Sequence, residues 1–209
     1  MQTLAYLVYL AVQWKFAVIG ALVVGIATWS FLSAQLFGRK KGGPGCVAIL
    51  AGLALILLFA FFGNGLANRL VHDHGVPGEA IATDTFATGH IYNEQRVYGF
   101  NVLIRTGGGR VVRTSFRTDS FNVHPSRNQT RYPGPGARFN VRYLPDHPDA
   151  FVIIADDDSE WARSLRCGDL LQEVARAAQA ANFAPGDAAF ARARDEAVAA
   201  ARAAGCIPG

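Results

Sequence analysis

Charged residues are scarce in this sequence of 209 residues, and the scarcity excludes a wholly soluble protein. Only 17% of the residues are charged and 51% are hydrophobic, whereas an ordinary soluble domain has roughly 25% charged residues. The deficit is concentrated in two stretches, residues 4–37 and 46–68, which are nearly free of charge. We therefore expect about a third of the chain in a membrane, with one small domain and a C-terminal appendage outside it.

The sequence also lacks the motifs of familiar enzymes. It contains no G-x-S-x-G nucleophile elbow, and the glycine run ending at Gly109 lacks the lysine and the helix of a phosphate-binding loop. His72 and His74 lie two residues apart and do not supply a complete metal shell. The sequence therefore predicts a non-enzymatic protein without cofactor or metal.

Lysine is absent after residue 41, and the basic residues before that point predict a topology. Residues 16–37 carry no charge over a length that spans the hydrocarbon core of a bilayer, and residues 46–68 form a second such segment. Between these two membrane helices stand Arg39, Lys40 and Lys41. Because positively charged loops stay in the cytoplasm, we expect a multi-pass protein of the bacterial inner membrane with both termini in the periplasm.

The N-terminal residues 1–15 form an interfacial segment in this interpretation. They end in Trp14 and Lys15, an aromatic and cationic pair typical of the bilayer surface. They lack the positively charged start of a signal peptide, so the first helix is expected to be retained as an anchor. The segment either continues that helix outward or lies along the membrane surface.

Residues 79–155 are expected to form an extracytoplasmic β-domain. In the segment 138–144, for example, Phe139, Val141 and Tyr143 alternate with polar residues, as in a strand with one buried face. The five predicted strands are 79–88, 95–105, 110–117, 138–144 and 150–155. Turn-forming residues fill the long connection 118–137. Five short strands with polar connections predict a small antiparallel, barrel-like domain.

Arginine dominates the charge of this domain. Residues 105–142 contain eight arginines, with Asp119 as the only acid. The candidate surface for an anionic partner consists of Arg105, Arg110, Arg113, Arg117, Arg138 and Arg142. This surface binds anionic lipid headgroups or an acidic protein partner; alternatively, it is neutralised by the chain's own acidic residues in 156–209. The outward topology argues against nucleic acid as a partner.

Part of this domain resembles a known family. Residues 79–154 combine a first strand, the glycine hairpin around 107–109 and a closing pattern of Gly136, Tyr143, Pro145 and Pro148 before a final strand. In this order of features the segment resembles the bacterial membrane-protein family of domain of unknown function 3592. The resemblance implies a membrane-attached β-domain, and it implies no catalytic residues.

Residues 156–209 are rich in alanine, arginine and acids, and they predict a helical hairpin. One helix is expected over 170–182 from a capping box at Asp169, and a second from a cap at Asp187 to about residue 204. Cys167 and Cys206 would then lie just outside the two helices. In an oxidising compartment this arrangement predicts a disulfide between them.

These features favour a binding role. We expect an accessory or scaffold subunit of an envelope complex, which contacts membrane lipid and a protein partner or further copies of itself. An immunity-type protein that captures a periplasmic toxin is a second hypothesis. An envelope hydrolase acting on lipid or peptidoglycan is the third, and it requires a histidine and an acid that face a polar cleft.

Overall fold

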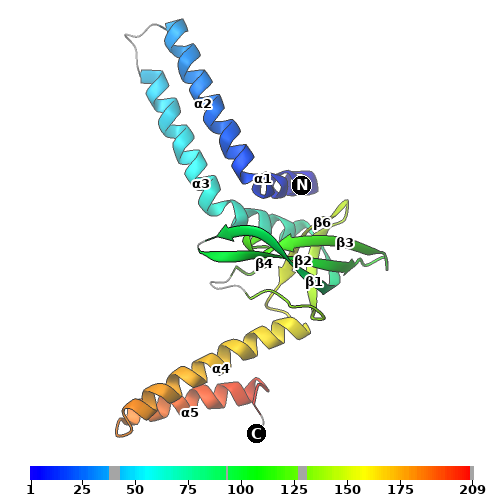
Figure 1. Ribbon diagram of the computed structural model, residues 1–209, viewed down its shortest axis with the longest axis vertical. Helices are drawn as coiled ribbons and strands as arrows, with labels where there is room; N and C mark the ends of the chain where they lie inside the picture. Colours follow the sequence, from blue (N-terminus) through cyan, green and yellow to red (C-terminus); the bar gives the residue numbers. More distant parts are fainter. Residues whose placement is uncertain (38–42, 93, 127–130, 208–209) are drawn as a thin grey trace.

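The computed structural model describes residues 1–37, 43–92, 94–126 and 131–207. A pair of helices lies at one end of the long axis, a β-sheet in the middle and a second pair of helices at the other end (Figure 1). The predicted topology residues Arg39, Lys40 and Lys41 lie outside the described part of the chain. The orientation that they imply therefore stays a prediction.

The first pair consists of α2 (Lys15–Phe37) and α3 (Gly43–His74). Both helices are long and apolar enough to cross a membrane. The sequence predicted an end of the second apolar segment at residue 68, but residues 69–74 continue α3 toward the sheet. The predicted end was wrong because Val71 packs with Leu144 and Val152 of the sheet, and such packing sustains a helix beyond its apolar segment.

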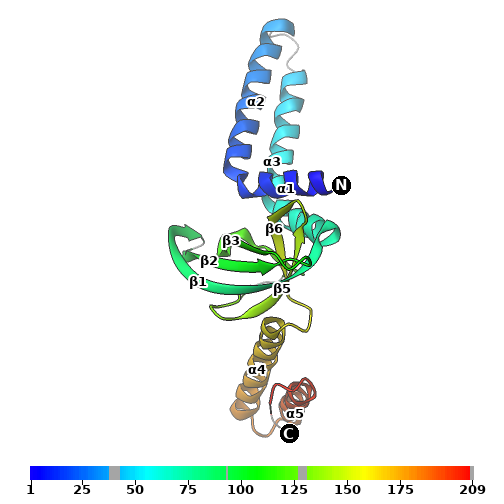
Figure 2. The same cartoon turned by 90° about the vertical axis from the view of Figure 1, so that its right-hand side faces the viewer.

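The N-terminal segment forms a helix of its own, α1 (Gln2–Gln13). Trp14 has left the helical conformation, with φ of −103° and ψ of 29°, and α2 starts at the next residue. As a result α1 lies across the base of α2 and beside the last part of α3 (Figures 1 and 2). Of the two arrangements considered for residues 1–15, the continuous helix is not the one observed.

The sheet has six strands, in the order β3-β2-β1-β5-β6-β4. Their bounds are β1 (Val76–Tyr92), β2 (Gln95–Arg105), β3 (Val111–Arg117), β4 (Val123–His124), β5 (Arg138–Leu144) and β6 (His147–Ile154). β4 pairs parallel to β6, whereas the other pairs are antiparallel. The sheet is thus mixed and open, and the prediction of five antiparallel strands was wrong because the two-residue β4 lies inside the predicted loop 118–137.

The sheet is curled although it is not closed. Phe116 of the edge strand β3 packs edge-on against Phe151 of β6, with ring centroids 6.1 Å apart. On its other face β6 buries Ala150 and Val152 against Ala5 of α1 and Val71 of α3. β6 is therefore buried on both faces, which explains its nearly continuous apolar sequence.

The second helical pair consists of α4 (Glu160–Phe183) and α5 (Ala188–Ala203), which lie on the opposite side of the sheet from α2 and α3 (Figures 1 and 2). The predicted cap at Asp187 is present, since its carboxylate accepts from the Ala189 amide at 2.8 Å. The predicted start near residue 170 was wrong. α4 starts ten residues earlier, after the N-cap Ser159, because Trp161 and Leu165, one turn apart, are buried in the core of the sheet.

Cys167 and Cys206 form a disulfide, with their Cα atoms 5.2 Å apart. Cys167 lies inside α4 and not before it, while Cys206 follows α5. The bond therefore ties the end of α5 to the part of α4 that is next to the sheet.

Candidate functional site

The register of three strands gathers polar side chains on the outer face of the sheet. Glu79 of β1 pairs with Arg105 of β2 on one side and with Asn140 of β5 on the other. Arg142 pairs with Pro77 two residues along. Because directly paired residues share a face, these side chains lie opposite the buried Phe139, Val141 and Tyr143.

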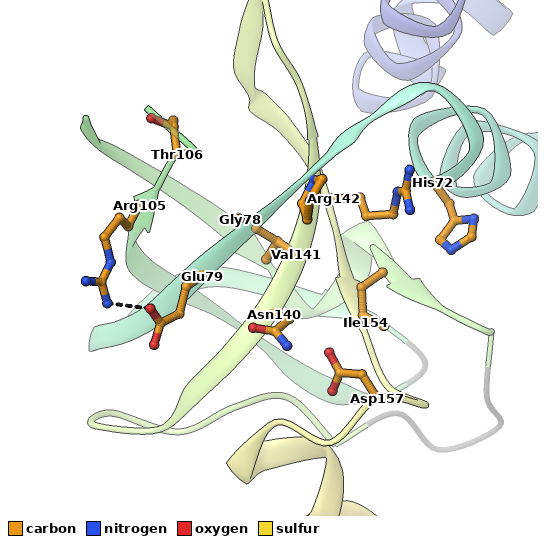
Figure 3. A pocket seen from close by; sticks show the side chains of 12 residues that line it. His72, Gly78, Glu79, Arg105, Thr106, Asn140, Val141, Arg142, Ile154 and Asp157 are labelled. Atoms are coloured by element: carbon orange, nitrogen blue, oxygen red, sulfur yellow. Dashed lines mark hydrogen bonds and ion pairs between the residues drawn. The ribbon is translucent and has the colours of Figure 1, made fainter. Parts of the chain in front are cut away.

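These side chains line an open groove of about 620 Å³, which we call the arginine groove. The last turn of α3 contributes His72 to it, and the chain after β6 contributes Asp157. Figure 3 shows Arg105 and Glu79 on one side of the groove, with Arg142 toward the α3 side. The groove is thus lined by residues from α3, β1, the end of β2, β5 and the segment 154–157.

Arginine side chains outnumber the acids that they contact here. Arg105 Nη2 donates a hydrogen bond to Glu79 Oε2, and Arg138 Nη1 lies 3.9 Å from the other oxygen of the same carboxylate. Arg142 Nη2 donates to the Gly75 carbonyl at 2.7 Å, while its Nε is buried and has no hydrogen-bond partner within the described part of the chain. The Glu79 carboxylate therefore contacts two guanidinium groups, and the guanidinium group of Arg142 is hydrogen-bonded to a backbone carbonyl.

The structure places five of the six predicted arginines on this outer face, at paired register positions: Arg105, Arg113, Arg117, Arg138 and Arg142. Arg110 lies in the turn that joins β2 to β3. At the end of β3, the Arg117 Nε contacts Asp119 Oδ1 at 3.0 Å.

The acids that contact Arg105, Arg138 and Arg117 come from the β-domain itself. Asp157 belongs to the acidic C-terminal segment and lines the groove. Its Oδ1 already accepts hydrogen bonds from the Ser159 amide at 2.9 Å and hydroxyl at 2.6 Å. For these arginines the alternative of neutralisation by the C-terminal helices has little support.

His72, which lines the α3 end of the groove, forms a pair with a second histidine. The His72 ring stacks on the His124 ring with centroids 4.0 Å apart, and His72 Nδ1 lies 3.1 Å from Asp73 Oδ1. Burial lowers the pKa of His124 below its ordinary value, and the neighbouring His72 lowers it further. His124 therefore resists protonation in the folded protein.

The chemistry of the groove favours binding of an anionic group. Guanidinium groups pair with carboxylates and phosphates in a bidentate manner, and Asn140 adds an amide that donates and accepts. The Thr106 hydroxyl, which also lines the groove, donates to the Arg110 carbonyl at 3.0 Å. Among the described residues, no group of three or more His, Cys, Asp or Glu side chains is placed to hold a metal ion.

Sequence reasoning missed Glu79, Asn140 and His72 as groove residues. The alternation in 138–144 was a usable signal for Asn140, since it places this residue on the same face as Arg138 and Arg142. The position of His72 depends on the continuation of α3, for which the sequence carried no clear signal.

Comparison of the chain with protein-family models, with curated proteins and with solved structures gives no match. The resemblance of residues 79–154 to the family named above therefore stays a prediction from the residues.

Proposed function

We propose that this protein is a membrane-anchored, non-enzymatic scaffold subunit that binds an acidic segment of a partner protein in the arginine groove. The observation that carries the proposal is that Glu79, which lines the open groove, contacts the guanidinium groups of both Arg105 and Arg138, while Arg142 lines the same groove. Carboxylate side chains of a partner would compete with Glu79 for the same guanidinium groups.

The proposed location is the bacterial inner membrane, with α2 and α3 as its two spans. The basic loop 39–41 would then stay in the cytoplasm, which puts the sheet and the C-terminal helices in the periplasm. The disulfide between Cys167 and Cys206 supports this orientation because disulfides persist in oxidising compartments.

The C-terminal hairpin offers a second surface for a protein partner. Near its turn, Phe183 is 92% exposed and Phe190 is 41% exposed. Exposed aromatic side chains are enriched where proteins bind one another. The proposed scaffold therefore has a polar contact surface at the groove and an apolar one at the hairpin.

The groove is tested by the affinity of the purified protein for a fluorescent oligoglutamate peptide, measured by anisotropy. Arg105→Gln removes one guanidinium and should weaken binding by about 1.5 kcal/mol, roughly tenfold. Arg194→Gln is the matched control, because Arg194 lies on α5 and pairs with the adjacent Asp195. Equal affinity of both variants would contradict the proposal.

The alternative of an immunity-type protein uses the same groove but binds a periplasmic toxin in place of a subunit of an envelope complex. Copurification from the native membrane with a stable complex supports the scaffold, whereas recovery with a secreted effector supports the immunity protein.

An envelope hydrolase is a second candidate because His72 and the adjacent Asp73 form a histidine and acid pair at the groove. Hydrolysis of lipid or peptidoglycan fragments that is lost in His72→Ala, with oligoglutamate binding retained, would favour the hydrolase over the scaffold.

A further inference from the structure

The two faces of α1 differ in what they contact. One face is held by the β-domain: Ala5 is fully buried, the Tyr6 ring stacks on His147 at 3.5 Å, and the Tyr9 hydroxyl donates to the Asp149 carbonyl at 3.1 Å. The opposite face carries Leu4 and Leu7, which are 51% and 57% exposed. An apolar helix of 12 residues thus keeps a row of leucines uncovered while its other side is fixed.

The exposed apolar surface continues past the end of α1. Trp14 and Phe16, at the start of α2, are 69% and 81% exposed. Lys15 between them places its Nζ 5.6 Å from the Phe16 ring centroid and 5.8 Å from that of Tyr92. The Tyr92 contact brings the tip of the β1–β2 hairpin beside the first turn of α2.

The hairpin tip has the same mixture of apolar and cationic residues. Ile91 is 73% exposed and pairs with the exposed Arg96. Tyr92 is half-exposed, and its ring packs edge-on against Phe121 at 5.7 Å. Aromatic, aliphatic and cationic side chains of this kind favour the boundary between lipid headgroups and acyl chains.

We propose that the outer face of α1 and the β1–β2 tip rest in the interfacial layer of the bilayer, as a lipid-contacting collar around the membrane helices. The collar consists of Leu4, Leu7, Trp14, Phe16, Ile91 and Tyr92. Its occupant is lipid because the collar is continuous with α2, a helix apolar enough to cross the membrane, and because Figures 1 and 2 show α1 lying across the base of that helix. Lys15 and Arg96 lie where they can meet the phosphates of anionic headgroups.

The inference rests on the membrane anchoring proposed above, and one labelling experiment tests the two separately. The full chain with Cys46→Ser and the disulfide kept oxidised is labelled with the dye NBD at single cysteines and reconstituted into vesicles of phosphatidylethanolamine and phosphatidylglycerol. Leu7→Cys and Ile91→Cys report on the collar, Val24→Cys on the middle of α2, and Phe183→Cys on the C-terminal hairpin. All four native side chains are exposed, so the substitutions leave the core intact.

We expect lipids labelled at the headgroup or near the top of the acyl chain to quench the dye at Leu7→Cys and Ile91→Cys several times more strongly than aqueous iodide does. Deep acyl-chain labels should quench Val24→Cys, and iodide should quench Phe183→Cys. Iodide quenching at the two collar positions, with Val24→Cys still in lipid, would overturn the collar and leave the anchoring intact. Iodide quenching at Val24→Cys would overturn both.

Two mixed results also count against the collar. Protection of Leu7→Cys and Ile91→Cys from both kinds of quencher would show that protein, such as a second copy of the chain, covers the surface. Lipid quenching at only one of the two positions would overturn the half of the collar that is not quenched.

Discussion

Asn68 is one of the few buried polar side chains of the protein and connects α3 to the chain around β4. It is 6% exposed, and its Nδ2 donates to the Phe121 carbonyl at 2.5 Å. Its position one turn before His72 means that this bond helps to hold the end of α3 against the sheet. A polar residue at the end of an apolar segment thus connects α3 to the β-domain.

Replacement of Asn68 by leucine should lower the free energy of unfolding by about 1–3 kcal/mol, because the Phe121 carbonyl loses one of its two donors and the buried contact of the Asn68 amide with the Val123 carbonyl, at 3.5 Å, is lost as well. Denaturant titration in detergent measures the change. Asn101→Leu is the control: Asn101 is exposed on the outer face of β2, so its loss should stay within about 0.5 kcal/mol. Similar stabilities of the two variants would show that the Asn68 bond contributes little.

The lowered pKa of His124 predicts that the stability of the folded protein depends on pH. Its pKa in the folded protein lies below the unfolded value of about 6.5, mainly because it is buried. A base that is harder to protonate when folded contributes full stability above the unfolded pKa, and this stability is lost as the pH falls toward the folded pKa. The other titratable or charged groups that act on it are His72, Asp156, Asp73 and Arg69.

The free energy of unfolding should therefore fall from about pH 7 to about pH 5 in the wild type, and less steeply in His124→Phe, which keeps a ring to stack on His72. His90→Phe, which makes the same replacement at an exposed histidine, is the comparison variant. An identical slope in wild type and His124→Phe would remove His124 as the cause.

At the scale of elements, the disulfide determines how well the C-terminal helices hold together. α4 and α5 are rich in alanine, so their contact buries little apolar area. The bond closes a sequence separation of 39 residues, which stabilises the closed form by about 4 kcal/mol in the chain-entropy model.

The double variant Cys167→Ser, Cys206→Ser should lose helicity in α5 while the sheet keeps its structure, because Trp161 and Leu165 still anchor the start of α4. Hydrogen exchange resolved by segment measures the difference: amides of 188–203 should exchange much faster and those of 138–154 should not. Cys46→Ser is the control with an unchanged profile. Loss of protection in the sheet as well would show that the hairpin supports the domain.

The elements that the sequence predicted well are those with a local signal. Alternation located β2 and β5 to the residue, and the Asp187 cap located the start of α5. The errors occurred where tertiary contacts determine the ends of a helix. α4 begins earlier than predicted because Trp161 and Leu165 pack in the core of the sheet, and α3 continues because Val71 packs against the sheet. The arginines were found from their positions in the sequence, but Glu79 was not, because strand pairing places it beside Arg105.

At the scale of the whole molecule, one small cluster joins α1 and α3 to the sheet. Ala5 of α1, Val71 of α3 and Ala150 and Val152 of β6 are all buried there. This cluster could not be predicted from the sequence because its members come from three segments more than 60 residues apart, and two of them are alanines. Their small side chains allow the helices and the strand to approach closely.

Ala5→Leu should therefore overpack the cluster, at a cost of about 1–3 kcal/mol. We expect a lower thermal midpoint in detergent and faster hydrogen exchange in 147–154, where β6 meets α1. Leu4→Ala changes the exposed neighbour and serves as the matched control, with little effect on either measurement. Unchanged exchange in Ala5→Leu would mean that α1 and the sheet are not packed as the structure shows.

The length of α4 has a mechanical consequence. Its 24 residues make a rod of about 36 Å, fixed at one end by Trp161 and Leu165 and stiffened near that end by the disulfide. A rotation of about 5° at the end of α4 that packs on the sheet displaces the other end of the helix by about 3 Å. The turn between α4 and α5, where Phe183 is exposed, is therefore the part of the hairpin that a small rotation at the sheet displaces farthest.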